Sequence, residues 1–202
     1  MKKGIKNVLC LTIITLVAGF ALGYVYDVTK EPIRIMEEKT KNDAYKKVFE
    51  TASSFEEVQL NIDDINQSIE AASIESVICD GALRAFDESG SPVGYVINVT
   101  SMAGYGGDIS ISVGIADSGE VLGVEILSIS ETAGLGMKAK EDDFRNQFKN
   151  KNVAKFSYTK AEPTAEFEIE ALSGATITTK AVTNAVNAAI CTFGEIGGEQ
   201  DA

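Results

Sequence analysis

Histidine and tryptophan are absent from this sequence of 202 residues, and cysteine and proline occur only three times each. Without histidine, the chain lacks the commonest metal ligand and the commonest general base. The cysteines are Cys10, Cys79 and Cys191, and no C-x-x-C spacing links them, so they do not indicate an iron–sulfur or zinc site. The sequence therefore predicts no metal site and no catalytic residue. Cys79 and Cys191 can pair only if they lie close together in an oxidising compartment.

Acidic residues are missing from the first 26 positions of the chain. Residues 27–202 hold all 30 acidic residues and 15 of the 18 basic ones, a net charge of −15. A charge this negative argues against binding to nucleic acid or to anionic lipid headgroups. It suits a domain that meets a basic partner, and it suits equally well an acidic domain that merely stays soluble.

Charged side chains are also missing from residues 7–26, an apolar run of 20 residues. A helix of that length spans about 30 Å, the hydrocarbon thickness of a bilayer. Lys2, Lys3 and Lys6 precede the run, which predicts a cytoplasmic N-terminus and an extracytoplasmic remainder. A cleavable signal peptide is the alternative, but the apolar run is long for one and no clear A-x-A site follows it. Residues 1–26 therefore predict a cytoplasmic N-terminus and a retained transmembrane helix in a cell membrane.

Residues 27–80 predict a helical and connecting region after the membrane anchor. Pro32 is expected to end or bend the helix that leaves the membrane. Residues 33–50 have helical character, whereas residues 51–78 are acidic, polar and poorly periodic. We expect a loosely specified connector over the second of these stretches.

From Gly81 onward the pattern favours strands, and residues 81–202 predict one domain. Ile109, Ile111, Val113 and Ile115 alternate with polar or small residues, which is the period of a half-buried strand. Strands are expected over residues 83–86, 93–100, 109–115, 121–130, 153–158 and 167–171, and helices over residues 142–148 and after residue 179. The first four strands suggest an antiparallel meander. The predicted fold class is α+β, with an antiparallel sheet and packed helices behind an N-terminal transmembrane helix.

The stretch with the clearest chemical content is the turn before the last predicted helix. Ser173, Gly174, Ala175 and Thr176 lie where a predicted strand passes into that helix. A helix N-terminus presents unpaired N–H groups and holds phosphate well, and the small residues let a large group approach the backbone. Thr176 would then offer a hydroxyl beside the anion. Ordinary N-capping by Ser or Thr explains the same residues and is common, so both interpretations stay open here.

Two further glycine-containing turns accompany this motif. Residues 131–138 follow a predicted strand and include Gly134 and Gly136, which free the backbone to wrap a planar or phosphorylated ligand. In this loop Glu131 and Thr132 could form hydrogen bonds, Leu135 could cover a ring face, and Lys138 could stabilise negative charge. The alternative is a solvated glycine loop. Residues 104–107, with Gly104 and Tyr105, form a third small-residue turn that could approach the same site.

With these three motifs the chain resembles the FMN-binding domain family, and within it the G subunits of Rnf complexes, which are ion-translocating ferredoxin:NAD oxidoreductases. The resemblance runs from the anchor to the last helix and is weakest over residues 51–80. It implies that FMN is attached through its phosphate to Thr176, with Ser173, Gly174 and Ala175 shaping the turn. It further implies that Glu131, Thr132, Leu135, Gly136 and Lys138, together with Gly104 and Tyr105, surround the flavin.

The chain departs from the family pattern at two positions. Ala133 stands where the family usually has proline, so the loop is expected to be less rigid. Glu170 stands where the family usually has aspartate, six residues before the acceptor threonine. The carboxylate is retained there and lies one methylene farther from the backbone.

The resemblance also implies partners and a mechanism. A separate, extracytoplasmic, Mg-dependent flavin transferase would attach the FMN, using FAD as donor. The chain would then relay electrons among membrane, iron–sulfur and flavin subunits of the complex, without substrate turnover of its own, while the complex moves Na⁺ or H⁺. Three alternatives stay open: the C subunit of the Na⁺-translocating NADH:quinone reductase, a membrane-anchored flavin-binding or sensory module without electron flow, and a structural assembly subunit.

Overall fold

The computed structural model describes residues 2–200, and side chains for residues 4–197. The chain divides into two compact units, Met1–Asn42 and Asp43–Ala202. The side chains of Lys2 and Lys3, on which the predicted orientation partly rests, lie outside the described residues.

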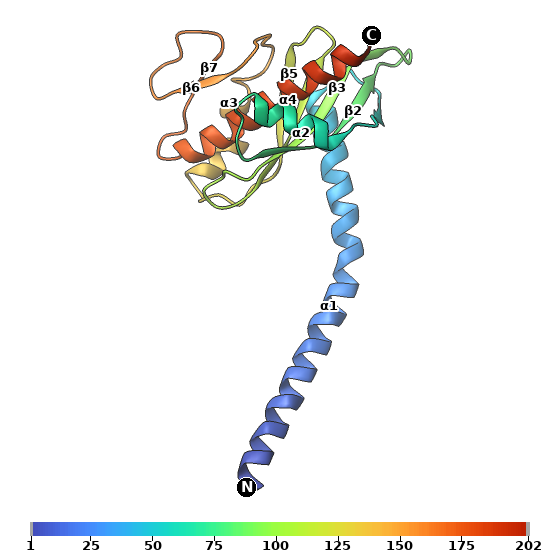
Figure 1. The fold of residues 1–202 in the computed structure, drawn as a ribbon, viewed down its shortest axis with the longest axis vertical. Helices are drawn as coiled ribbons and strands as arrows, with labels where there is room; N and C mark the ends of the chain where they lie inside the picture. Colours follow the sequence, from blue (N-terminus) through green and yellow to red (C-terminus); the bar gives the residue numbers. More distant parts are fainter. Residues whose placement is uncertain (1, 201–202) are drawn as a thin grey trace. The chain divides into compact units, whose positions relative to one another are not determined.

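The first unit is helical over its described residues, 2–42. Helix α1 (Lys2–Val48) begins in this unit and is unbroken along its length (Figure 1). Its Gly4–Val48 portion is the one helix, among the described residues, that is long and apolar enough to cross a membrane. The side chains of the apolar run are exposed, as expected for a segment whose surroundings are lipid.

Pro32 was expected to end or bend the helix; it does not end it, because α1 continues past it for 16 residues, and the bend stays a prediction. Proline removes only one backbone donor from a helix, and local side-chain pairs bridge the neighbouring turns. Arg34 donates to Glu31 at 2.6 Å and to Glu38 at 2.5 Å, spacings at which opposite charges stabilise a helix.

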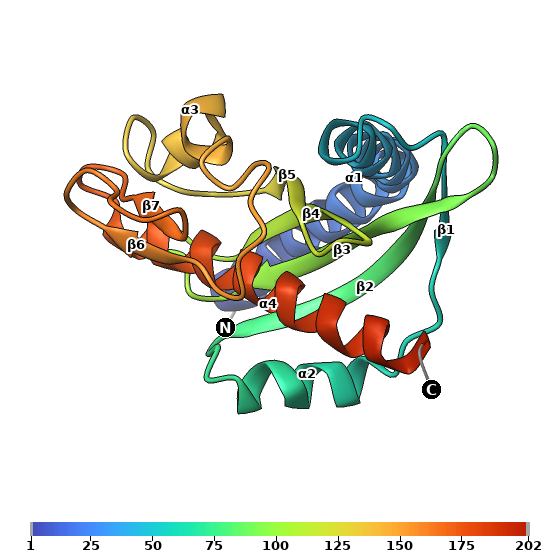
Figure 2. The same ribbon diagram turned by 90° about the horizontal axis from the view of Figure 1, so that it is seen from above.

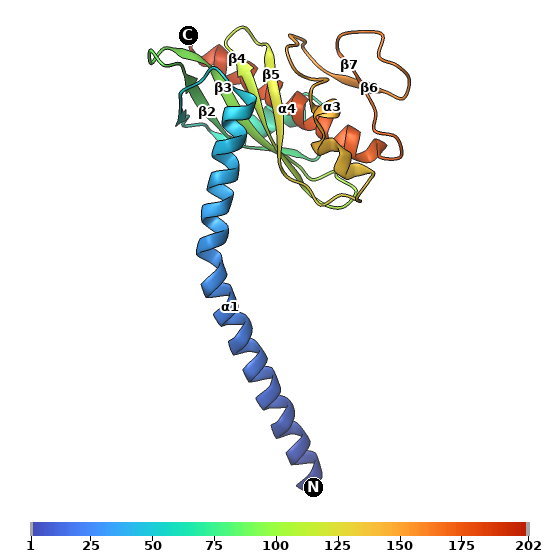
Figure 3. The same cartoon turned by 180° about the vertical axis from the view of Figure 1, so that it is seen from behind.

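The second unit is built on a five-stranded antiparallel sheet in the order β1-β2-β3-β4-β5. The strands are β1 (Ser54–Glu57), β2 (Val77–Phe86), β3 (Pro92–Ser101), β4 (Ile109–Ala116) and β5 (Val121–Ser128). Each strand pairs with the one before it in sequence, so the predicted antiparallel meander is confirmed. Figure 3 shows β2, β3, β4 and β5 side by side, with β6 and β7 apart from them.

Helices cover one face of this sheet. Helix α4 (Thr176–Gln200) contacts β2, β3 and β4, and α2 (Ile62–Ala71) contacts both β2 and α4 (Figure 2). The fully buried side chains between them are mostly Val, Ile and Ala. Val182, Val186 and Ala189 are among them and recur in the sequence at steps of four and three residues, which is the apolar stripe that predicted a helix after residue 179.

The other face of the sheet receives the last turns of α1, which belong to the second unit. Tyr45, Val48 and Phe49 are buried there and pack against Val96 of β3. A Cβ atom at Gly114 would lie 2.3 Å from the carbonyl oxygen of Val48, so only glycine permits this approach of helix to strand. The sheet is therefore covered on both faces near its centre.

The predicted loose connector over residues 51–78 is wrong, since this stretch contains β1 and α2. Ile65 and Ile69 of α2 are buried at a helical spacing, but the surrounding acidic residues hide that short stripe. Strand β2 also begins four residues before Gly81, with a register shift between Cys79 and Gly81. The predicted domain boundary at Gly81 thus falls inside a strand.

The segment after β5 forms short elements and a second, two-stranded sheet. These are the 3₁₀ helix η1 (Gly136–Lys140), α3 (Asp142–Arg145), β6 (Ser157–Thr159) and β7 (Glu168–Glu170). Strands β6 and β7 are shorter than predicted and pair with each other in parallel. The side chain of Gln147 accepts a hydrogen bond from the Glu170 N–H at 2.7 Å, so a side chain satisfies a donor on this strand and no further strand is needed there.

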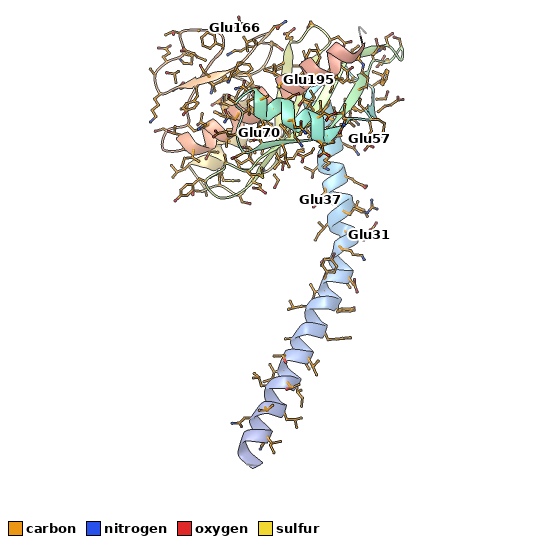
Figure 4. All side chains as sticks on the ribbon, in the orientation of Figure 1. Glu31, Glu37, Glu57, Glu70, Glu166 and Glu195 are labelled. Carbon is orange, nitrogen blue, oxygen red and sulfur yellow. The ribbon has the colours of Figure 1, made fainter. Side chains whose placement is uncertain are left out.

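Acidic side chains are spread over the second unit. Glu57 of β1, Glu70 of α2, Glu166 of the β6–β7 loop and Glu195 of α4 are exposed and come from separate elements (Figure 4). A negative charge dispersed in this way maintains solubility and outlines no single acidic binding face among these residues.

The cysteines are free thiols in the described structure: Cys79 is buried, Cys191 is half-buried and Cys10 is exposed. Burial raises the pKa of both the Cys79 and the Cys191 thiol. A raised pKa lowers the fraction of thiolate, which is the reactive form, in both cysteines. Whether they pair under oxidising conditions stays a prediction.

Candidate functional site

The site is built around the first turn of α4, which begins at Thr176. Gly174 has φ of +75°, a left-handed conformation that glycine adopts without strain. The N–H of Ala175 donates to the carbonyl of Leu172 at 2.9 Å, which closes the turn. The Oγ1 of Thr179 accepts from the Leu172 N–H at 3.0 Å and donates to the Ala175 carbonyl at 3.0 Å, so one buried hydroxyl ties the turn to the helix.

The N-terminus of α4 is not capped by a side chain in the described structure. Ala175, which has no polar side-chain atom, precedes the helix, and the hydroxyls of Ser173 and Thr176 form no hydrogen bond among the described residues. The N–H groups of Thr176, Ile177 and Thr178 likewise have no acceptor in that part of the chain. Simple N-capping by Ser173 or Thr176 is therefore not what this turn does, and three helix donors are left for an anion.

Thr176 differs from its threonine neighbours in accessibility. Its side chain is half-exposed, whereas Thr178 and Thr179 are 1% and 0% exposed. The Thr179 hydroxyl is already engaged by the turn. Of these three hydroxyls only that of Thr176 is open to an incoming group.

The loop of residues 131–136 lies against this turn. Leu135 and Met137 donate backbone hydrogen bonds to the carbonyl of Thr132 at 3.1 and 3.2 Å, and Gly134 takes φ of +75°. The Cδ2 atom of Leu135 lies 3.2 Å from the point that a Cβ of Gly174 would occupy. Leu135 remains 43% exposed, so it presents an apolar side chain to solvent beside the helix start.

The turn of residues 104–107 reaches the same loop from the other side. The backbone N–H of Tyr105 donates to the Oε1 of Glu131 at 2.7 Å. A Cβ at Gly106 would lie 2.1 Å from the carbonyl oxygen of Ser130, and a Cβ at Gly136 would lie 2.7 Å from the Oγ1 of Thr178. The three glycine-bearing segments that the sequence singles out therefore meet at one place.

The remaining predicted residues occupy varied positions. Gly136 and Glu131 are buried, Gly104 is half-buried, and Thr132, Ala133 and Lys138 are exposed. The described structure gives no polar contact that links Lys138 to the α4 turn. Glu170 is exposed in β7, where its backbone is held by Gln147.

Sequence reasoning missed the two buried threonines and the exposed Ile177. Thr179 holds the turn, Thr178 faces Gly136, and Ile177 is 52% exposed directly after Thr176. For the two threonines the only sequence signal was the run of hydroxyl residues itself. That run could not show which hydroxyl is buried and which is open.

Comparison with known sequences identifies the family of this chain. Residues 104–191 match the FMN-binding domain family, and this range contains all three segments. The chain is 32% identical over 185 residues to the G subunit of the Na(+)-translocating ferredoxin:NAD(+) oxidoreductase complex of Acetobacterium woodii, covering 90% of this chain and 87% of that protein. It is 30% identical over 180 residues to the G subunit of the proton-translocating ferredoxin:NAD(+) oxidoreductase complex of Clostridium ljungdahlii, covering 89% and 86%.

Solved structures support the fold. The crystal structure of the C subunit of the Na(+)-translocating NADH-quinone reductase from Parabacteroides distasonis superposes with a TM-score of 0.51 at 18% identity, covering 77% of this chain and 83% of that one. NqrC of Shewanella oneidensis superposes with a TM-score of 0.50 at 21% identity, covering 59% of each chain. The α+β fold with an antiparallel sheet and packed helices is thereby confirmed.

The clamp made by Thr179 can be tested by substitution with valine, which has nearly the same shape. We expect Thr179→Val to destabilise the second unit by about 1–3 kcal/mol, because the Leu172 N–H loses its acceptor. The matched control is Thr183→Val, also buried in α4, whose hydroxyl only donates to the Thr179 carbonyl at 2.8 Å. Thermal unfolding of the full chain in detergent, with amide exchange at Leu172, measures both. Equal losses in the two variants would contradict the clamp.

Proposed function

This chain belongs to the family of G subunits of ion-translocating ferredoxin:NAD(+) oxidoreductase complexes, and on that premise we propose that its FMN is bound covalently, through the phosphate, to Thr176. A member of this family is a flavin-binding electron-transfer subunit of an oxidoreductase complex. We propose three things beyond that assignment: the point of attachment, the membrane orientation and the enzyme that attaches the flavin.

The observation that carries the attachment proposal is the uncapped start of α4 with an open hydroxyl beside it. Three helix N–H groups lack acceptors among the described residues, and the half-exposed Thr176 begins the helix. A phosphate ester on Thr176 would lie next to those donors and next to the positive end of the helix dipole. The neighbouring threonines are buried and so do not compete for modification.

The surrounding residues fit a flavin mononucleotide. Gly174 and Ala175 leave room for the phosphate, while Leu135, Ile177 and Tyr105 expose 43%, 52% and 72% of their surfaces on the segments that meet there. Apolar and aromatic side chains are suitable partners for a flat ring. When bound, the flavin supplies the electron-accepting and electron-donating chemistry that the side chains of this chain lack.

The protein's own part in the reaction is to hold and orient. Ser173, Gly174 and Ala175 shape the turn, the α4 N–H groups hold the phosphate, and Leu135 and Tyr105 bound the ring. Glu131, Thr132 and Lys138 are proposed as further polar groups of the site. No residue of the chain is proposed to transfer a proton to a substrate, and electrons pass to and from other subunits of the complex.

We further propose that maturation and topology are linked. A separate flavin transferase, acting outside the cytoplasm with FAD as donor, would attach the FMN, and this requires the second unit to lie on that side. The predicted cytoplasmic position of the N-terminus agrees with such an arrangement.

The alternative, that the chain is the C subunit of an NADH:quinone reductase, rests on a fold likeness at 18% and 21% identity, whereas the G subunits match in sequence over most of the chain.

Attachment is tested by in-gel flavin fluorescence after denaturing electrophoresis of the full chain produced beside a flavin transferase. We expect a fluorescent band for the wild type and none for Thr176→Ala, because the acceptor oxygen is gone. Ser173→Ala removes the other hydroxyl of the same turn and should stay fluorescent, which distinguishes the two acceptors. A dark wild-type band, or a bright Thr176→Ala band, would exclude the proposed linkage.

The electron relay is tested in the assembled complex. Thr176→Ala should abolish ferredoxin-dependent reduction of NAD⁺ in membranes, because an open site cannot retain an untethered cofactor. Ser128→Ala, which removes an exposed hydroxyl at the end of β5 outside the three segments, should keep the wild-type rate. Complex assembly is checked by the amount of each protein component. Full activity in an assembled Thr176→Ala complex would favour a sensory or structural role.

The membrane orientation is tested by cysteine labelling in a variant whose three native cysteines are replaced. Glu88 lies in the exposed β2–β3 turn and Lys6 precedes the apolar run. A membrane-impermeant maleimide should label Glu88→Cys in intact cells and Lys6→Cys only after the membrane is opened. The reverse pattern would overturn the proposed topology.

A further inference from the structure

Glu131 is an unusual acidic residue in this chain. It is 8% exposed and is the only carboxylate among the described residues that is buried. Burial of a carboxylate is costly unless hydrogen bonds or opposite charges compensate it. The described structure gives it no ion pair, so the reason for its burial must lie in the hydrogen bonds and packing around it.

One side of Glu131 holds the turn of residues 104–107. Its Oε1 accepts the Tyr105 N–H at 2.7 Å and lies 3.0 Å from the point that a Cβ of Gly104 would occupy. A Cβ at Gly106 would lie 3.2 Å from the Cα of Glu131. Because both glycines are needed for this approach, the turn lies directly against the Glu131 backbone and carboxylate.

Glu131 also lies against Gly136, which in turn lies against the start of α4. A Cβ at Gly136 would lie 2.7 Å from the Glu131 Cβ, 2.8 Å from its Oε2 and 2.7 Å from the Thr178 Oγ1. Gly136 is thus packed between Glu131 and the first turn of the helix that begins with Thr176. Glu131 therefore contacts the Tyr105 turn directly and reaches the α4 start through this glycine.

We propose that Glu131 is a positioning residue for the flavin, acting through the Tyr105 turn. The inference rests on the proposed FMN site and assigns different roles to two of its residues. Thr176 attaches the cofactor, while the Glu131 carboxylate fixes the turn that carries the exposed Tyr105 ring. Loss of Glu131 should therefore leave the flavin attached and free its ring to reorient, because a hydrogen bond to a charged acceptor is among the stronger ones in proteins.

The test uses the full chain in detergent, with and without the flavin transferase. Glu131→Met removes the acceptor at nearly constant volume, Glu131→Gln retains an oxygen acceptor without the charge, and Glu88→Gln is a matched control in an exposed turn. Three quantities are measured: in-gel flavin fluorescence, the visible circular dichroism of the bound flavin, and amide exchange at Tyr105 in the flavin-free protein.

For Glu131→Met we expect a wild-type fluorescent band, loss of the visible circular dichroism, and Tyr105 exchange faster by about tenfold or more. Glu131→Gln should restore most of the dichroism and the amide protection, and Glu88→Gln should match the wild type. A purely structural role elsewhere would not produce rescue by glutamine.

Two results would overturn the proposal. One is wild-type dichroism and Tyr105 exchange in Glu131→Met, and the other is a Glu131→Gln variant as impaired as Glu131→Met. Failure of the proposed function looks different, because the wild-type band itself would then be dark. The exchange measurement needs no flavin and decides in that case whether Glu131 holds the turn.

Discussion

The packing of α4 across the sheet is the constraint on which the rest of the second unit depends. Ala181, Ala185, Ala188 and Ala189 are all 0% exposed, and their small side chains let the helix axis approach the strands closely. Interiors packed at this density cannot shift one element without moving its neighbours. The position of the helix start is therefore fixed by residues that lie one to four turns away from it. The apolar interface between α4 and the sheet thus determines the geometry of the site.

The loops that meet at this helix start are placed by close backbone approaches. Gly106 abuts the Ser130 carbonyl, Gly136 abuts Thr178, and Gly174 abuts Leu135. A single methyl group would fill or block each of these contacts. The loops therefore fit together only because glycine has no side chain at these positions. Functional residues are often carried on loops that a rigid scaffold holds in place. In this chain the scaffold is the antiparallel meander together with α4. The loops contact one another, and the helix, at the glycines.

Much of the fold could be predicted because its signals are local. The alternation of Ile109 with Ser110 and Ile111 predicted β4, and the apolar stripe after Thr179 predicted α4. What could not be predicted depended on tertiary contacts: the acidic stretch that conceals Ile65 and Ile69 of α2, and the use of a Gln147 side chain at the edge of β7. The three motifs of the site were visible in the sequence, but their meeting was not, since it rests on the glycine approaches. The clamp of Thr179 on Leu172 had no sequence signal that separates it from its neighbours.

The openness of the site gives a physical reason for a covalent bond. Tyr105, Ile177 and Leu135 are 72%, 52% and 43% exposed, whereas sites that retain small molecules by contacts alone bury most of the ligand surface. A carrier that exchanges electrons with other subunits needs its ring within reach of them, and such exposure weakens retention. On the proposed function, the ester to Thr176 meets the need for retention, so the surrounding residues have only to orient the ring. That separation explains how a site with one buried carboxylate, a few apolar side chains and an uncapped helix can suffice for an electron-transfer subunit.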